Sequence, residues 1–209
     1  MNARLLGLVL VAVVAWNAAF SVAGHYGIFL TVGAAALVAT MRALAVPTPW
    51  RELFTARRGA LIAAAAATAL LVCVTAFFRA PVLQALPALD AQVRGIYALF
   101  GPTNLVESYL ALPLIAIAEE LVFRGAIQGG LELRLGRTGA AIAAAVLYAC
   151  GHLASGFPAL VGLALVLGLF WGLLRARTGS LWPGVLSHVV WDLFVVVWAP
   201  LGASHTFHV

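Results

Sequence analysis

The stretch AEELVFRG, residues 118–125, lies inside a long run of apolar residues. It places Glu119 and Glu120 side by side, with Arg124 shortly after, in a segment that otherwise has the composition of a membrane span. A carboxylate in the hydrocarbon of a bilayer costs roughly 2.5–3.5 kcal/mol on insertion scales. Two adjacent glutamates at such a position therefore indicate either a pairing partner or a chemical role.

The composition of the whole chain is that of a membrane protein. Of its 209 residues, 64% are hydrophobic and 9% are charged, and the mean hydropathy is +1.07. So few charges cannot cover the surface of a soluble domain of this length. The sequence predicts an all-α, polytopic transmembrane helix bundle, organised as a single domain over residues 1–209.

Seven apolar runs are long enough to cross a bilayer. They cover residues 4–23, 27–45, 59–78, 104–123, 139–156, 159–174 and 180–199. With this arrangement, ten of the twelve arginines, Arg124 included, fall on one side, and only Arg79 and Arg94 fall on the other, in a loop over residues 79–103. The positive-inside rule then predicts a cytoplasmic N-terminus and a C-terminus outside.

The basic residues also bear on source and partners. All twelve are arginines, and the chain is rich in alanine, which points to GC-rich coding and to a bacterial inner membrane. Because the arginines lie between apolar runs, they are explained by membrane topology, and no nucleic-acid partner is expected. Four tryptophans near expected span ends are assigned to the aromatic belt at the membrane surfaces: Trp16, Trp50, Trp182 and Trp198.

Three of the expected spans carry polar groups four residues apart. The pairs are Glu120 with Arg124, Tyr148 with His152, and His188 with Asp192. This spacing places two side chains on one face of a helix. An ion pair with Arg124 offsets much of the burial cost of Glu120 and leaves Glu119, turned by about 100°, without a partner on its own helix. Glu120 is therefore predicted to be structural, and Glu119 to be available for chemistry.

A carboxylate near imidazole groups can serve two kinds of site. It can act as a general base toward a water molecule while a histidine stabilises the developing oxyanion. Alternatively, Glu119, His152 and His188 can act together as zinc ligands. The chain has neither HExxH spacing nor a Cys-rich signature, so a site without a cofactor is favoured and zinc is the alternative.

The position of His152 along its span needs a further assumption. Counted at 1.5 Å per residue, His152 lies roughly 8 Å nearer the outer surface than Glu119 and His188. The connection that follows it, LASGFPAL at residues 153–160, contains no charge. This predicts a turn held inside the protein rather than at the membrane surface, which brings His152 to the depth of the other groups.

With these three motifs the sequence resembles the CAAX-protease and bacteriocin-processing family of intramembrane proteases. The family motif EExxxR, often extended to FRG, is complete at residues 119–125. The second motif, an aromatic residue and a histidine four positions later, is present with Tyr148 in place of the usual phenylalanine, and His188 with Asp192 forms the third. The resemblance covers residues 104–199, the motif-bearing core, and the earlier helices match only as hydrophobic spans.

The resemblance implies cleavage of a peptide bond within the membrane by a glutamic-type protease. Glu119 would activate water, His152 would assist as a partner or oxyanion donor, and His188 and Asp192 would complete the polar site. Glu120, Arg124 and Tyr148 would support it, Tyr148 mainly by packing. Asp192 stands where many relatives have asparagine; because an ionised aspartate cannot donate a hydrogen bond, Asp192 is either protonated or orients His188 or a water.

The expected partners are the lipid bilayer and a membrane-anchored protein or peptide substrate. Family substrates include prenylated C-termini, bacteriocin-related peptides and, in the myxosortase-like branch, C-terminal sorting anchors. The compact chain favours a sorting or maturation role. The alternative is a non-enzymatic protein, a transporter or a bacteriocin-immunity-type binding protein that uses the same polar site.

Overall fold

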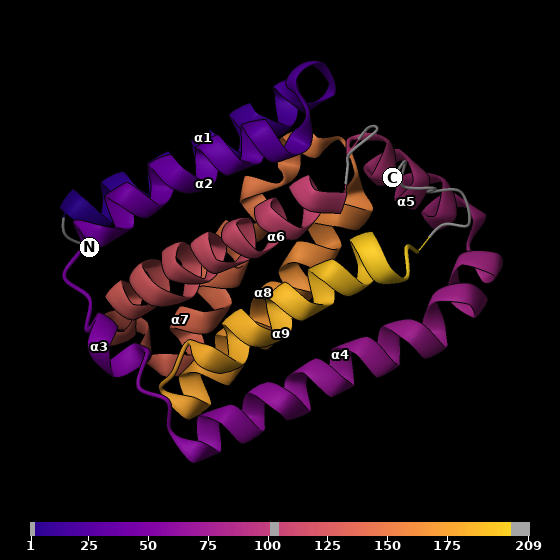
Figure 1. The fold of residues 1–209 in the computed structure, drawn as a ribbon. Helices are drawn as coiled ribbons and strands as arrows, with labels where there is room; N and C mark the ends of the chain where they lie inside the picture. The colour runs from indigo at the N-terminus through magenta and orange to yellow at the C-terminus, as the bar shows by residue number, and fades with distance from the viewer. Residues whose placement is uncertain (1–2, 101–104, 202–209) are drawn as a thin grey trace.

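The computed structural model describes residues 3–100 and 105–201, and helices dominate both ranges (Figure 1). No strand occurs among the described residues, so the predicted all-α class is confirmed. The α-helices are α1 (Ala3–Tyr26), α2 (Ile28–Leu44), α3 (Trp50–Leu53), α4 (Arg58–Ala85), α5 (Pro87–Ala98), α6 (Leu105–Glu119), α7 (Gly129–Gly151), α8 (Pro158–Thr178) and α9 (Trp182–Leu193). The π-helical segment η1 (Glu120–Gln128) joins α6 to α7, the short 3₁₀ turn η2 (Leu153–Ser155) precedes α8, and the π-helical segment η3 (Phe194–Trp198) follows α9.

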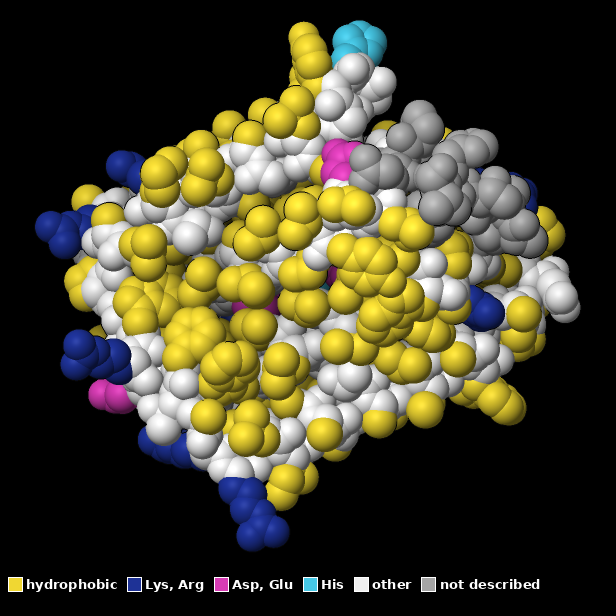
Figure 2. Space-filling view, viewed as in Figure 1, with side chains coloured by type: hydrophobic (Ala, Val, Ile, Leu, Met, Phe, Trp, Pro, Cys, Tyr) yellow, Lys and Arg dark blue, Asp and Glu magenta, His cyan; other side chains and the backbone are white. Residues whose placement is uncertain are grey.

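The helices form a bundle suited to a bilayer. Among the described helices, α1, α4 and α8 are each long and apolar enough to cross a membrane, and α2 and the segment Trp182–Trp198 are shorter apolar helices. Large apolar side chains such as Phe77, Leu110 and Val166 are exposed on the outside of the bundle, and Figure 2 shows apolar side chains over most of one face. A soluble protein does not leave an apolar surface of this extent uncovered, so the helical membrane bundle is confirmed.

Two of the expected span boundaries are wrong. Helix α4 continues to Ala85 and contains Pro81, although a loop was expected from residue 79. Proline removes only one backbone donor from this helix, and the following residues are good helix formers. The expected loop over residues 79–103 is therefore largely helical, as the end of α4 and then α5.

The second wrong boundary is the end of the span at residue 123. The helix continues from α6 through η1 into the first residues of α7, and the break comes at Gly136, with φ 67° and ψ 171°. Glycine adopts this backbone conformation readily, whereas other residues do not. Arg124 is consequently not in a cytoplasmic loop, as the count of arginines assumed, but is buried inside the bundle at 1% exposure.

Arginines nevertheless concentrate at one end of the bundle. The start of α1, the end of α2, helix α3 and the start of α4 lie together at this end (Figure 1) and carry Arg4, Arg42, Arg51, Arg57 and Arg58. Figure 2 shows the corresponding basic side chains along the left and lower edges of the view. The described chain ends at the opposite end of the bundle, where the backbone N–H of Leu201 donates to the Tyr97 hydroxyl of α5 at 3.0 Å.

We expect this asymmetry to orient the protein with its arginine-rich end in the cytoplasm. Reporter tags at the N-terminus and within residues 46–58 should report a cytoplasmic location, and a tag at the C-terminus should report the outside. The two cytoplasmic tags control for each other because they flank an even number of helices. A cytoplasmic C-terminal tag would contradict the orientation.

Candidate active site

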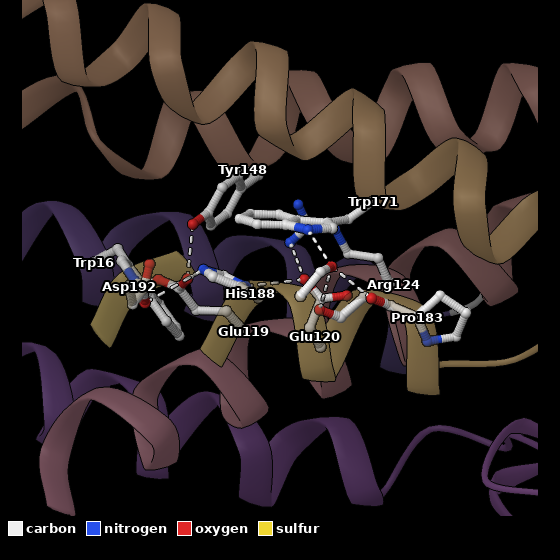
Figure 3. A network of polar contacts seen from close by, with 11 residues as sticks. Trp16, Glu119, Glu120, Arg124, Tyr148, Trp171, Pro183, His188 and Asp192 are labelled. Atoms are coloured by element: carbon white, nitrogen blue, oxygen red, sulfur yellow. Dashed lines mark hydrogen bonds and ion pairs between the residues drawn. The ribbon is translucent and has the colours of Figure 1, made fainter. Parts of the chain in front are cut away.

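Glu119, the last residue of α6, is held by side chains from two other helices (Figure 3). Its Oε1 accepts a hydrogen bond from Nε1 of Trp16 in α1 at 2.9 Å. Its Oε2 accepts a hydrogen bond from the hydroxyl of Tyr148 in α7 at 2.7 Å. The side chain is buried. It does not pair with Arg124, as the spacing of the two residues predicted, but both of its oxygens accept hydrogen bonds from other helices.

Two of these contacts differ from the sequence interpretation. Trp16 was assigned to the aromatic belt, but it is fully buried in the middle of α1. The sequence of α1 is that of a largely apolar span, and nothing in it indicated that the indole N–H of Trp16 meets a carboxylate more than a hundred residues away. Tyr148, expected mainly to pack, also donates a hydrogen bond to Glu119.

Glu120 and Arg124 form the buried ion pair that their spacing predicted. Nη1 of Arg124 lies 3.2 Å from Oε1 of Glu120, and both side chains are 1% exposed. The guanidinium group also lies over two aromatic rings, 4.5 Å from the ring centroid of Tyr148 and 5.3 Å from that of Trp171. Aromatic faces stabilise a desolvated cation, so the positive charge of Arg124 is held by one carboxylate and two rings.

His188 of α9 connects the two glutamates (Figure 3). Its Nδ1 lies 3.2 Å from Oε1 of Glu120, and its Nε2 lies 3.6 Å from Oε2 of Glu119 and 3.6 Å from Oδ2 of Asp192. The ring stacks on Trp171 of α8, with centroids 3.7 Å apart and an interplanar angle of 19°. Glu120 therefore orients His188 in addition to pairing with Arg124, a second role that the sequence did not indicate.

The close approach of α9 to Glu120 depends on Gly184. A Cβ at this position would clash with Oε2 of Glu120. Gly184 lies one helical turn before His188, so its missing side chain lets the helix bring the imidazole to the carboxylate. The sequence alone did not distinguish this glycine from the others in the chain.

His152 lies at the end of α7, where it is buried at 5% exposure. Its Nδ1 lies 2.8 Å from the backbone carbonyl of Tyr148. Because a carbonyl oxygen only accepts, Nδ1 carries a proton in this contact, and Nε2 of the neutral ring is an acceptor. The ring packs against Phe20 and Tyr148.

The turn after His152 is tied to two other helices, but it is not held wholly inside the protein as expected, because Leu153, Ala154 and Gly156 are exposed. The amide side chain of Asn17 in α1 contacts the turn on both sides of His152. Gln92 of α5 accepts a hydrogen bond from the backbone N–H of Ala159 at 2.8 Å. Phe157 packs so closely on Gly95 of α5 that a Cβ there would clash with its ring.

The four residues predicted to be catalytic, together with Tyr148, line one cavity of about 430 Å³, whereas Glu120 and Arg124 do not line it. Its polar lining includes Glu119, Tyr148, His152, His188 and Asp192. The rest of the lining is largely apolar and comes from α1, α2, α4, α5, α6, α8 and α9, with side chains such as Phe29, Val74, Phe78, Leu112 and Leu163. In Figure 2, acidic side chains are visible deep among the apolar side chains near the middle of the face.

The arrangement can be compared with the two kinds of site considered for the sequence. It offers a carboxylate whose two oxygens accept N–H and O–H donors, next to two imidazole rings in an apolar cavity. In the described part of the chain, no three His, Cys, Asp or Glu side chains are grouped as ligands of one metal ion. A desolvated carboxylate beside histidines can move a proton to or from a bound water.

The interior of this helical membrane bundle therefore holds carboxylates and imidazoles around one apolar cavity, and part of the chain resembles a known family of membrane proteases. Residues 101–194 match the model of a family described as type II CAAX prenyl endopeptidase Rce1-like. The motif-bearing segment is therefore similar to this family of CAAX proteases. The match includes all three motifs and a little under half of the chain, so α1 to α5 lie outside it. No curated protein and no solved structure matches the chain.

Proposed function

We propose that this protein is an intramembrane endopeptidase in which Glu119 activates a water molecule to cleave a peptide bond of a membrane-anchored protein or peptide. The observation that carries the proposal is the position of Glu119. Its carboxylate is held by Trp16 and Tyr148 and lines the same apolar cavity as His152 and His188. The family of the motif-bearing segment supports a protease.

Glu119 and His152 can share one water molecule. An ionised carboxylate accepts hydrogen bonds, and the proton on Nδ1 of His152 leaves its Nε2 as an acceptor. A water that donates one hydrogen to each group directs a lone pair toward the substrate carbonyl. Glu119 then takes a proton from the attacking water as a general base.

His188 and Asp192 lie next to Glu119, with Nε2 of His188 at 3.6 Å from a carboxylate oxygen of each, where they can stabilise the oxyanion. Glu120 and the stacked Trp171 hold the ring of His188 from two directions, so its Nε2 is directed at the cavity. In its imidazolium form His188 would donate from Nε2 to the oxyanion of the tetrahedral intermediate. A preorganised donor in a site that excludes water is worth far more than the same donor in water.

The cavity points to an apolar substrate segment. Its volume of about 430 Å³ lies within the range of small-molecule sites, roughly 300–1,000 Å³, and its lining is largely apolar away from the polar groups. A lipid-modified C-terminus or the apolar part of a membrane anchor would lie along this lining and present the peptide bond to Glu119. We favour the processing of a C-terminal sorting anchor or a maturing peptide, because the chain is compact and has a bacterial composition.

The function is tested with purified protein in lipid vesicles. One probe is an internally quenched peptide with a farnesylated cysteine four residues from its C-terminus, and its control is the same peptide without the lipid. A second assay is co-expression with membrane-anchored proteins encoded beside this one, scored by intact mass for a shortened C-terminus. Cleavage in either assay supports the protease. Binding of the probes without cleavage by the folded protein would instead support the transporter or immunity-type alternative.

Asp192 is expected to act as a hydrogen-bond donor. Because Glu120 already orients His188 through Nδ1, Asp192 is not needed for that purpose. Asp192→Asn keeps a donor at this position, so its cleavage rate should stay within about threefold of the wild type. Asp192→Leu should lose about 10²–10³-fold, as expected for removal of one oxyanion donor. Equal losses in both variants would show that the carboxylate itself is required.

The zinc alternative is addressed by chelation. We expect extensively chelated protein to keep its activity and elemental analysis to find well under one metal per chain, since donors from α1 and α7 already engage both oxygens of Glu119. The positive charge of Arg124 lies close by and disfavours a cation. Activity that is lost on chelation and restored by stoichiometric zinc, but not by magnesium, would replace the carboxylate mechanism and leave the protease assignment intact.

A further inference from the structure

The structure points to a part for α1 in the catalytic site, outside the segment that matches the family. We propose that the consecutive residues Trp16 and Asn17 are positioning residues, Trp16 for Glu119 and Asn17 for His152. The proposal rests on the proposed function of those two groups. According to this proposal, helix α1, which in sequence is only a hydrophobic span, sets the distance between Glu119 and His152 and so lets both groups contact one water.

Trp16 makes a contact that packing alone does not require. Its ring is fully buried, and its Nε1 is directed at Oε1 of Glu119 at 2.9 Å. The edge of the ring also packs on Phe123, with centroids 5.7 Å apart. With Tyr148 on Oε2, the indole N–H leaves the carboxylate little freedom to rotate, because each oxygen has its own donor from a different helix.

Asn17 bridges the chain on both sides of His152. Its Nδ2 donates to the backbone carbonyl of Cys150 at 2.8 Å, and its Oδ1 accepts from the backbone N–H of Ala154 at 2.7 Å. The carbonyls at the end of a helix have no partner within the helix, and here one side chain satisfies such a carbonyl and also fixes the next turn. The backbone that carries His152 is therefore attached to α1 at two points.

Trp16 and Asn17 are adjacent in α1, so the contact with Glu119 and the contacts around His152 are made by the same part of one helix. Neighbouring residues on a helix point in directions about 100° apart, so Trp16 meets α6 while Asn17 meets the end of α7. A single rigid element thus sets the separation between Glu119 and His152. If a general base and its partner must both contact one water, a small error in that separation lowers the rate of the chemical step more than the binding of substrate.

The test separates the hydrogen bond from the packing of the indole. Trp16 is replaced by 3-benzothienylalanine, in which a sulfur atom takes the place of the ring N–H and the shape is retained. Cleavage of the quenched peptide probe in vesicles should show kcat lower by about 10–100-fold with KM within about twofold, the range expected for loss of a hydrogen bond to a charged group. Asn17→Leu should show the same division between kcat and KM.

Trp182 provides a matched control. Its Nε1 donates to the backbone carbonyl of Phe54, also at 2.9 Å, but Phe54 does not line the cavity, whereas Glu119, the partner of Trp16, does. The same replacement at Trp182 should leave kcat and KM within about twofold of the wild type. Thermal unfolding of each variant shows whether a loss of activity reflects a loss of folded protein.

A second measurement needs no substrate. The chain has six tryptophans, so the indole N–H signals of isotopically labelled protein can be resolved and assigned by substitution. The Trp16 signal should move on Glu119→Gln and stay in place on Glu52→Gln, an exposed position in α3. An unmoved signal in the Glu119 variant would show that the hydrogen bond is absent, and would overturn the proposal whether or not any probe is cleaved.

The outcomes for the two proposals differ. Full activity of the 3-benzothienylalanine protein, with Glu119→Gln inactive, would reduce Trp16 to packing while the protease mechanism stands. Full activity of Asn17→Leu would do the same for Asn17. Full activity of Glu119→Gln would instead overturn the proposed mechanism, whatever the result at Trp16.

Discussion

Glu119→Gln is expected to abolish cleavage while leaving the protein folded and inserted. Glutamine has nearly the same volume as glutamate and keeps one carbonyl oxygen that can accept from Trp16 or Tyr148, the donors now bound to Oε1 and Oε2. It cannot take a proton from water. Loss of a general base lowers the rate by about 10²–10⁴-fold, and the loss should appear in kcat because the apolar lining of the cavity is unchanged.

The measurement compares single-turnover cleavage with the melting temperature of the same preparation. Glu52→Gln is the matched control, since this exposed glutamate in α3 lies away from the cavity and its replacement should change neither quantity. An inactive Glu119→Gln protein that also fails to fold would show that the residue is structural. A folded and fully active variant would remove Glu119 from the mechanism.

Glu120→Gln is expected to have its main effect on stability. The carboxylate of Glu120 forms an ion pair with Arg124, and both side chains are 1% exposed. Nη1 and Nη2 of Arg124 have no hydrogen-bond acceptor among the described residues. Removing one member of a buried pair leaves an uncompensated charge, which costs about 3–5 kcal/mol. We expect lower abundance in the membrane and a lower melting temperature. Activity per folded molecule should also fall, because His188 loses an ionised acceptor for Nδ1.

The pair formed by Asp90 and Arg94, also four residues apart, offers a control for this prediction. The Arg94 side chain is 55% exposed, against 1% for Arg124, so solvent can replace much of the lost interaction. Asp90→Asn should therefore destabilise the protein by no more than about 1 kcal/mol. The double variant Glu120→Leu with Arg124→Met should recover abundance without activity, since a buried pair can be replaced by apolar side chains. Normal folding of an inactive Glu120→Gln, together with an active Glu119→Gln, would reverse the two roles.

The chemical identity of the site was readable from the sequence because polar groups are rare in this chain. Ionisable side chains within apolar runs stand out, and a spacing of four residues is a local property of helices. The ion pair of Glu120 with Arg124 follows from that spacing, and the structure contains it. The all-α bundle likewise follows from a composition that only a membrane can accommodate.

The boundaries of the spans were less predictable. Hydropathy registers where a chain changes from apolar to polar, not where a helix ends. Arg124 was placed in a loop because a charge interrupts the apolar run, yet the helix continues to Gly136 and the charge is neutralised inside the bundle. The loop expected from residue 79 is another case, because α4 continues to Ala85 and tolerates the one backbone donor that Pro81 lacks.

By itself, the sequence determined that this is a helical membrane protein and which polar residues lie within its apolar runs, since both follow from local composition and from spacing along one helix. The tertiary structure alone decided which groups meet. The contacts of Glu119 with Trp16, and of Glu120 with His188, join helices far apart in the chain. Such contacts depend on how helices pack and on where a small residue such as Gly184 permits close approach, and no periodicity within a single helix encodes them.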